Sequence, residues 1–307
     1  MWGCCKNKKV IISPLILLIL SLISPPVRSE PANPPNSHKK VVKFGIISRY
    51  NPYIMYRDYQ PIMDYLTQNT PYHFELKLGK NYEDTVNYLA TGATEVASLG
   101  ALTYLEAHKR FGAIPILKPL NAEGQPFYRS IIIVRNDSPI RSLKELKGHS
   151  FAFASLHSTS GNLISRYYLA QHDIHLKDLK SYVNLMHHDS VAEAVLKGEY
   201  DAGSVKDIIA YKYQDKGLRF LYQSPPIPGV PITVRPDTPK DLIGWIKQAL
   251  LALDRNNPAH QKIMQDWNAE FQHGFSEAKD TDYEPLRQML NHIPEGCGEG
   301  CHPRLSF

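Results

Sequence analysis

Residues 151–162 read FAFASLHSTSGN and join three local signals in one short stretch. An apolar strand comes first, a turn rich in hydroxyl groups follows, and a helix begins at its end. Ser158 is well suited to cap that helix because its oxygen can accept a hydrogen bond from a free backbone N–H group. The apolar residues that give the helix its one-sided stripe are Leu163, Ile164, Tyr167, Tyr168 and Ala170. A strand that runs through such a turn into a helix is typical of an α/β fold.

The same turn has the chemistry of an anion site. The start of a helix carries unpaired N–H groups and a partial positive charge, which together favour phosphate-like groups. The hydroxyls of Ser158, Thr159 and Ser160 add donors, and Gly161 lets the backbone come close. A tetrahedral oxyanion is therefore the first ligand to consider, while a simple capping segment is the alternative. The pattern of a nucleotide P-loop is absent.

The first 29 residues predict a secretory signal peptide. Lys6, Lys8 and Lys9 precede the apolar run 10–23, and Val27-Arg28-Ser29 offers small or tolerated residues at the cleavage positions. An uncleaved anchor is the alternative, but the run is shorter than the roughly 20 residues that a membrane helix needs. We expect the mature chain to be exported.

Charge argues against a nucleic-acid partner. The 307-residue chain has a formal net charge of +5, and the first 29 residues hold four cationic side chains and no acidic one. Cleavage near Ser29 would leave +1, which removes the basic excess that nucleic-acid binding needs. Residues 30–40 are rich in proline and asparagine and predict a flexible tether.

Strands and helices alternate along the rest of the chain, which predicts an α/β fold. The first set comprises strands over 41–47, 74–78, 96–99 and 114–120, with helices over 55–70 and 84–90. The second set comprises strands over 151–154, 182–186, 201–205 and 218–222, with a helix over 191–196. The strand 128–135 and the proline-rich segment 224–231 are predicted to cross between two lobes. A strand over 232–234 and helices over 242–253, 261–267 and 283–290 complete the prediction.

Two tyrosines follow strand ends, where ligand crevices lie in α/β sheets. Tyr50 comes after the first strand, and Tyr104 comes in the turn that starts at Gly100. Both are candidate ligand residues, although a core tyrosine with a solvated hydroxyl is the common alternative.

Several stretches, taken in order, resemble one known family. The matching segments are 59–66 (YQPIMDYL), 100–104 (GALTY), 128–135 (YRSIIIVR), 138–148 (SPIRSLKELKG), 158–161 (STSG), and His188-Asp189 ahead of Gly198 and Asp201-Ala202-Gly203. Over about residues 41–294, the chain is similar to the phosphate/phosphite/phosphonate-binding family of periplasmic ABC-transporter solute-binding proteins, which has the type 2 periplasmic binding protein fold.

The resemblance implies two lobes that close on a ligand held in the cleft between them, each with a mixed sheet flanked by helices. The first lobe would take residues 41–127 plus 229–294 and the second 128–228, leaving 295–307 as a tail. The family's ligand contacts map onto Tyr50, Tyr104, Ser158, Thr159, Ser160, His188 and Asp207.

Two of these assignments carry a chemical condition. A carboxylate such as Asp207 repels a bare anion unless it accepts a proton from the ligand or faces an amino group, and a surface or hinge charge is its alternative. His187 and His188 would point in opposite directions if extended, and the resemblance favours His188.

The carboxy-terminal tail departs from the family. Cys297 and Cys301 are separated by three residues and followed by His302. A local disulfide is the expected pairing in an exported protein, with metal binding or thiol sensing as alternatives. The haem-attachment pattern needs only two residues between its cysteines.

The sequence therefore predicts an exported binding protein that captures phosphate, phosphite or a phosphonate and presents it to an ABC transporter permease. We expect a monomer with no cofactor, no metal and no catalytic residues. The alternative is a periplasmic module that senses an oxyanion or a metalloid and docks on a receptor kinase. A hydrolase using Ser158 or Ser160 with His188 is disfavoured because no Gly-x-Ser-x-Gly motif surrounds either serine.

Overall fold

The computed structural model describes residues 39–291. The predicted signal peptide, most of the predicted tether, and the tail with Cys297 and Cys301 lie outside the described residues. Within residues 39–291, none of the helices combines the length and the apolar character that crossing a membrane requires.

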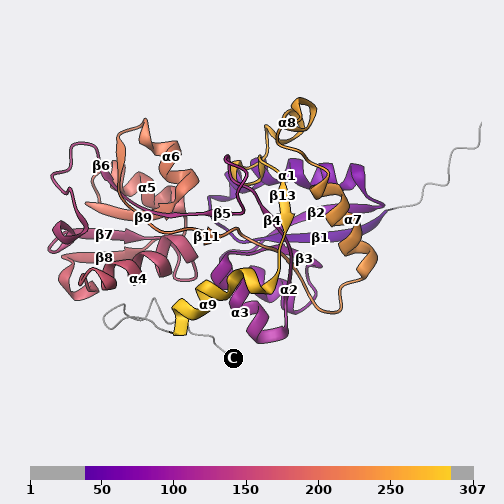
Figure 1. The fold of residues 1–307 in the computed structure, drawn as a ribbon, viewed down its shortest axis with the longest axis horizontal. Helices are drawn as coiled ribbons and strands as arrows, with labels where there is room; N and C mark the ends of the chain where they lie inside the picture. The colour runs from indigo at the N-terminus through magenta and orange to yellow at the C-terminus, as the bar shows by residue number, and fades with distance from the viewer. Residues whose placement is uncertain (1–38, 292–307) are drawn as a thin grey trace, which may run out of the picture. The chain divides into compact units, whose positions relative to one another are not determined.

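One lobe, here called lobe 1, is built on a six-stranded mixed sheet (Figure 1). Its strands, in spatial order, are β13 (Phe275–Glu277), β4 (Ile114–Pro119), β12 (Ile232–Val234), β3 (Val96–Ser98), β1 (Lys40–Ile46) and β2 (Tyr72–Leu78). β1 pairs in parallel with β2 and β3, whereas β12 runs antiparallel to β3 and β4. The helices of this lobe are α1 (Pro52–Asn69), α2 (Tyr82–Ala90), α3 (Ala101–Phe111), α7 (Lys240–Leu251), α8 (Pro258–Met264) and α9 (Glu284–Asn291). Figure 1 shows α1 and α7 on one face of the sheet and α2 and α3 on the other.

The second lobe, here called lobe 2, has a five-stranded sheet. Its order is β10 (Leu218–Gln223), β6 (Ser130–Arg135), β9 (Ala202–Lys206), β7 (Ser150–Phe153) and β8 (Ser181–Asn184). The helices α4 (Ile164–Gln171), α5 (His188–Leu196) and α6 (Asp207–Gln214) pack on it (Figure 1). β7 is parallel to β8 and β9, so the turns that follow β7 and β9 lie at the same edge of the sheet.

Two short strands connect the lobes. β5 (Phe127–Tyr128) and β11 (Ile227–Pro228) pair antiparallel between the two sheets. The buried Tyr283 donates a hydrogen bond of 2.8 Å to the carbonyl of Gly229, next to β11. The chain thus passes twice between the lobes. The hydrogen bond from Tyr283, the residue before α9, holds the second crossing against lobe 1.

Several element limits differ from those predicted. The first helix starts at Pro52 and not at Met55, because Asn51 caps it through a hydrogen bond from the Ile54 N–H. α8 lies three residues earlier than the predicted helix, at Pro258–Met264. β13 was not predicted, since its three residues carry no clear alternation.

Gly203 fixes how closely α5 packs on the sheet of lobe 2. It lies in β9, and a Cβ atom placed there would come within 2.7 Å of Val191 and 2.9 Å of Val195, both on α5. Gly244 offers a contrast, because it lies on an exposed part of α7 with no atom within 4 Å of a Cβ.

We predict that Gly203→Ala lowers the free energy of unfolding by about 1–3 kcal/mol, because the added methyl group forces α5 off the sheet. Gly244→Ala is the matched control and should raise it by about 0.5–1 kcal/mol through helix propensity. Urea denaturation of both variants measures the difference. Equal effects of the two substitutions would contradict this account of the packing.

Candidate functional site

The turn predicted to bind an anion follows β7 as a wide helical turn. Residues Thr159–Leu163 form a π-helical turn that leads into α4. Ser158 precedes it and acts as N-cap, since its Oγ accepts a hydrogen bond of 3.0 Å from the Gly161 N–H. The predicted cap is therefore confirmed, although the first turn is wider than an α-helix.

His188 fixes the direction of the Ser158 hydroxyl. The Lys206 N–H donates to His188 Nδ1 at 3.2 Å, so the ring carries its proton on Nε2, which lies 3.2 Å from Ser158 Oγ. Ser158 Oγ then accepts from His188 and from Gly161, which fills both lone pairs. Its own hydrogen is therefore available for donation, and the Tyr82 phenol oxygen is one acceptor within reach.

The His188 ring is neutral. Burial, followed by the nearby charges of Lys206 and Arg49, lowers its pKa to about 3. The phenol of Tyr82 hydrogen-bonds Ser158 as well, and burial raises the Tyr82 pKa to about 12. These groups are hence uncharged hydrogen-bonding partners at neutral pH.

Thr159 connects the two lobes. Its Oγ1 accepts a hydrogen bond of 2.9 Å from the N–H of Leu102, in the first turn of α3 in lobe 1. The phenol of Tyr128, in the crossing strand β5, hydrogen-bonds the same threonine, and burial raises the Tyr128 pKa. A hydroxyl from lobe 2 thus sits where a helix of lobe 1 offers free N–H groups.

The backbone at Ser160 and Gly161 is held rigidly. The Ser160 carbonyl accepts hydrogen bonds from three buried hydroxyls, those of Ser130 at 2.6 Å, Ser165 at 2.9 Å and Ser204 at 3.0 Å. A Cβ at position 161 would come within 2.4 Å of Ala154 and 2.7 Å of His188. Only glycine therefore fits beneath the His188 ring.

The two predicted tyrosines have different surroundings. Tyr50 is buried, and no residue in the described part of the chain hydrogen-bonds its hydroxyl. Burial raises its pKa, so the phenol keeps its proton and is a buried hydrogen-bond donor without an acceptor among residues 39–291. Tyr104 instead donates to Asp280 at 2.6 Å and packs on the Tyr283 ring, so the structure does not bring its hydroxyl to Ser158.

Four charged side chains are buried beside these donors. Arg49 Nη1 lies 3.2 Å from Glu270 Oε2, and Lys206 Nζ contacts the other oxygen of the same carboxylate. Arg49 and Glu270 belong to lobe 1, whereas Lys206 ends β9 in lobe 2, with its ammonium 4.1 Å from the centre of the Tyr128 ring. Glu270 is thus the centre of a buried ion-pair cluster that spans the lobes.

Asp207 lies next to this cluster at the start of α6. Its two oxygens accept hydrogen bonds of 2.8 Å from the N–H groups of Arg129 and Ile208. Burial raises the pKa of Asp207, while the charge of Lys206 lowers it. The carboxylate is therefore oriented by the backbone and keeps further lone pairs for a proton-bearing group.

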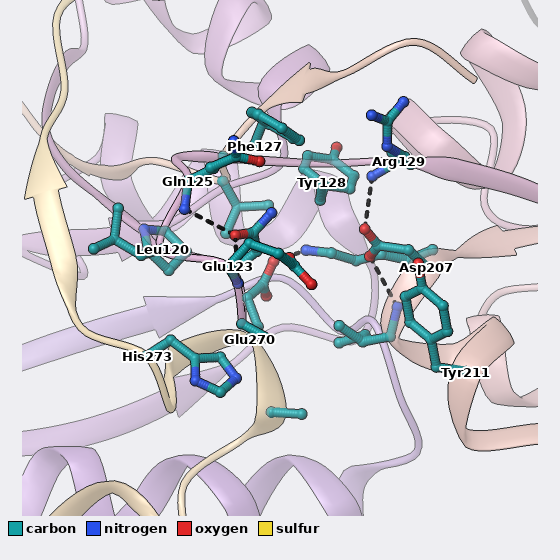
Figure 2. Close-up of a pocket in the computed structure, with 18 of the residues that line it drawn as sticks. Leu120, Glu123, Gln125, Phe127, Tyr128, Arg129, Asp207, Tyr211, Glu270 and His273 are labelled. Carbon is teal, nitrogen blue, oxygen red and sulfur yellow. Dashed lines mark hydrogen bonds and ion pairs between the residues drawn. The ribbon is translucent and has the colours of Figure 1, made fainter. Parts of the chain in front are cut away.

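A cavity of about 470 Å³ opens beside the cluster (Figure 2). Lys206, Asp207, Glu270 and Tyr128 line it, as do residues of both lobes that include Glu123, Phe127, Arg129, Tyr211 and His273. Ser158, Thr159 and Ser160 are not part of its lining. Tyr128 and Lys206 belong to the lining and also hydrogen-bond Thr159 and His188, so they stand between the cavity and the hydroxyl turn.

Five residues of this neighbourhood are not predicted from the sequence, namely Arg49, Tyr82, Tyr128, Lys206 and Glu270. Arg49 and Lys206 are direct neighbours of the predicted Tyr50 and Asp207, which is a signal that could have been used. Glu270 has none, because it lies far along the chain in a short 3₁₀ turn. No cluster of three or more metal-binding side chains occurs within residues 39–291.

The two sheets, the double crossing and the donors between the lobes define a two-lobed periplasmic binding protein of type 2. Residues 44–283 match the family described as the periplasmic substrate-binding protein of phosphonate ABC transporters. Because this match covers most of the chain, the protein belongs to that family.

Individual relatives agree with this assignment. The phosphonates-binding periplasmic protein of Escherichia coli is 28% identical over 251 residues, which cover 77% of this chain and 73% of the relative. A probable phosphite-binding protein of an ABC transporter from Prochlorococcus marinus, PhnD1, is 22% identical over 90% of this chain and 96% of its own length.

Solved structures show the same fold. The binding component of a phosphonate ABC transporter from Pseudomonas aeruginosa superposes with a TM-score of 0.74 at 23% identity, covering 82% of this chain and 86% of that one. PhnD1 of Prochlorococcus marinus, solved with methylphosphonate, gives a TM-score of 0.73 at 20% identity over 82% of this chain and 98% of that one.

An ion pair between the lobes should make the stability of the protein depend on pH. His157 of lobe 2 lies 3.3 Å from Glu106 on α3, and this hydrogen bond raises the His157 pKa above 6.5 despite burial. A raised histidine pKa gives stability that is complete below pH 6.5 and is lost as the pH rises through the raised value. We expect Glu106→Gln to cost about 0.5–1 kcal/mol of unfolding free energy at low pH and almost nothing at high pH.

Urea denaturation at several pH values measures this difference. Glu199→Gln, which removes an exposed carboxylate, is the control and should show no such trend. A cost of Glu106→Gln that grows with pH would show that the ion pair does not act as described.

Proposed function

We propose that this protein binds a phosphorus oxyanion, that is phosphate, phosphite or a phosphonate, through Ser158, Thr159 and Ser160. The observation that carries the proposal is the Ser158 hydroxyl, whose lone pairs are both filled and which can therefore only donate, either to the Tyr82 phenol oxygen or to a ligand. Tyr50 adds a buried phenol without a partner among residues 39–291. Buried neutral donors suit an oxyanion, which needs many hydrogen bonds when it leaves water.

The remaining predicted residues take secondary places in this proposal. His188 holds Ser158 in position, and Asp207 accepts a proton or an amino group from the ligand. Tyr104 would have to release Asp280 to reach a ligand, so we place it outside the direct contacts. The methylphosphonate bound to PhnD1 of Prochlorococcus marinus supports a ligand of this class.

We also propose the setting in which the site works. The chain would be exported through its first 29 residues and would act as a monomer in the periplasm. Residues 128–228 would close against 41–127 plus 229–294 and present the bound oxyanion to an ABC transporter permease. Family membership supports this transport role and supports a binding function over catalysis.

We predict that Thr159→Val weakens binding of methylphosphonate by about tenfold to a hundredfold, because the isosteric change removes one buried hydroxyl from the anion site. Isothermal titration calorimetry with phosphate, phosphite and methylphosphonate measures this loss, and at least one of the three should bind the wild type. Thr85→Val is the matched control, since Thr85 is equally buried in lobe 1 and its hydroxyl, within residues 39–291, hydrogen-bonds only the Ile46 carbonyl.

Unchanged affinity in Thr159→Val, or an equal loss in Thr85→Val, would place the ligand elsewhere. No binding of any of the three anions to the wild-type protein would refute the proposed function.

A further inference from the structure

The buried carboxylate of Glu270 contacts two cations but accepts no hydrogen bond from a neutral group within residues 39–291. We propose that Glu270 sets the charge of the oxyanion that the site accepts, by cancelling one of the two buried positive charges of Arg49 and Lys206. This inference rests on the proposed function, because it concerns the ligand bound at Ser158–Ser160.

The geometry makes Glu270 a counter-charge. Its side chain and those of Arg49 and Lys206 are each only 3% exposed. Neither carboxylate oxygen receives a hydrogen bond from a neutral group within residues 39–291, so the two cations are its polar partners there. Arg49 is held by further hydrogen bonds to Tyr59, Ser98 and the Leu99 carbonyl. Removal of Glu270 would therefore leave Arg49 and Lys206 without the carboxylate that they share.

Both cations act on the hydroxyl turn. The Arg49 carbonyl accepts a hydrogen bond of 3.1 Å from the His188 N–H, and the Lys206 N–H donates to the ring of the same histidine. Their charges lower the pKa of His188, and the Arg49 charge lowers the pKa of Tyr82 and of Tyr128 as well. An oxyanion at Ser158 lies among these three groups and is subject to the same positive potential.

The charge balance indicates which oxyanion fits. Burial and the charge of Arg49 lower the pKa of Lys206, whereas its contact with the Glu270 carboxylate favours the ammonium form. With that ammonium in place, Arg49 and Lys206 contribute two positive charges, Glu270 removes one, and the neighbouring Asp207 opposes a second negative charge on the ligand. Tyr50, Tyr59 and Tyr128 are neutral, because burial raises the pKa of each phenol. The wild-type site is thus matched to an oxyanion of low charge, and it would favour a dianion if Glu270 were neutral.

Phosphite and hypophosphite test this directly, because they are similar in size but, at a pH where phosphite has lost both protons, differ by one charge. We expect Glu270→Gln to strengthen phosphite binding relative to hypophosphite by on the order of tenfold, as the loss of one nearby negative charge requires. Isothermal titration calorimetry on the full mature chain measures both affinities at one such pH.

Opposite and compensating variants separate charge from structure. Lys206→Met should shift the same ratio about tenfold toward hypophosphite, and the double variant should return close to the wild-type ratio. A merely structural role would change both ligands equally and would overturn the inference, as would shifts of the same sign in the two single variants. Should Glu270→Gln fail to unfold cooperatively in urea, the Lys206→Met ratio decides alone. If the wild type binds neither phosphite nor hypophosphite, this inference is overturned, whereas the proposed function stands or falls with the separate titrations of phosphate, phosphite and methylphosphonate.

Discussion

The pair of hydrogen bonds on the His188 ring is the constraint on which the candidate site depends. The Lys206 N–H assigns the ring proton to Nε2, and that proton occupies one lone pair of Ser158. Because burial keeps the ring neutral, this direction does not reverse at physiological pH. A serine that could otherwise accept or donate is thereby turned into a donor, which is what an anion requires.

The same histidine connects the site to the position of the lobes. Its N–H donates to the Arg49 carbonyl in lobe 1, and the Thr159 hydroxyl accepts from the first turn of α3. Arg49 and Lys206 meet on Glu270, so one carboxylate joins charges from both lobes. The hydrogen-bond donors, the buried charges and the contacts between the lobes are therefore connected through the same residues. A ligand that alters one of these features acts on the others.

Sequence alone predicted the fold class and the Ser158 cap, because periodicity and capping are local signals. The α/β order, the crossing segments and the Ser158 cap depend on residues close together in the chain. The start of α1 could have been predicted from Asn51-Pro52, a common cap followed by proline at the first helical position. The role of Glu270 could not be predicted, because its contact with Lys206 arises only from tertiary packing. The same holds for the direction of the Tyr104 side chain, which is set by its hydrogen bond to Asp280. Tyr82 begins a helix and carries no sign of its contact with Ser158.

The most direct test is a crystal structure of the protein with methylphosphonate. The account predicts phosphonate oxygens within hydrogen-bond distance of Ser158 Oγ and of the Tyr50 hydroxyl, with the His188 ring still bonded to Ser158. A phosphonate seated in the cavity beside Tyr211 and His273, with the Ser158–Ser160 turn untouched, would contradict it.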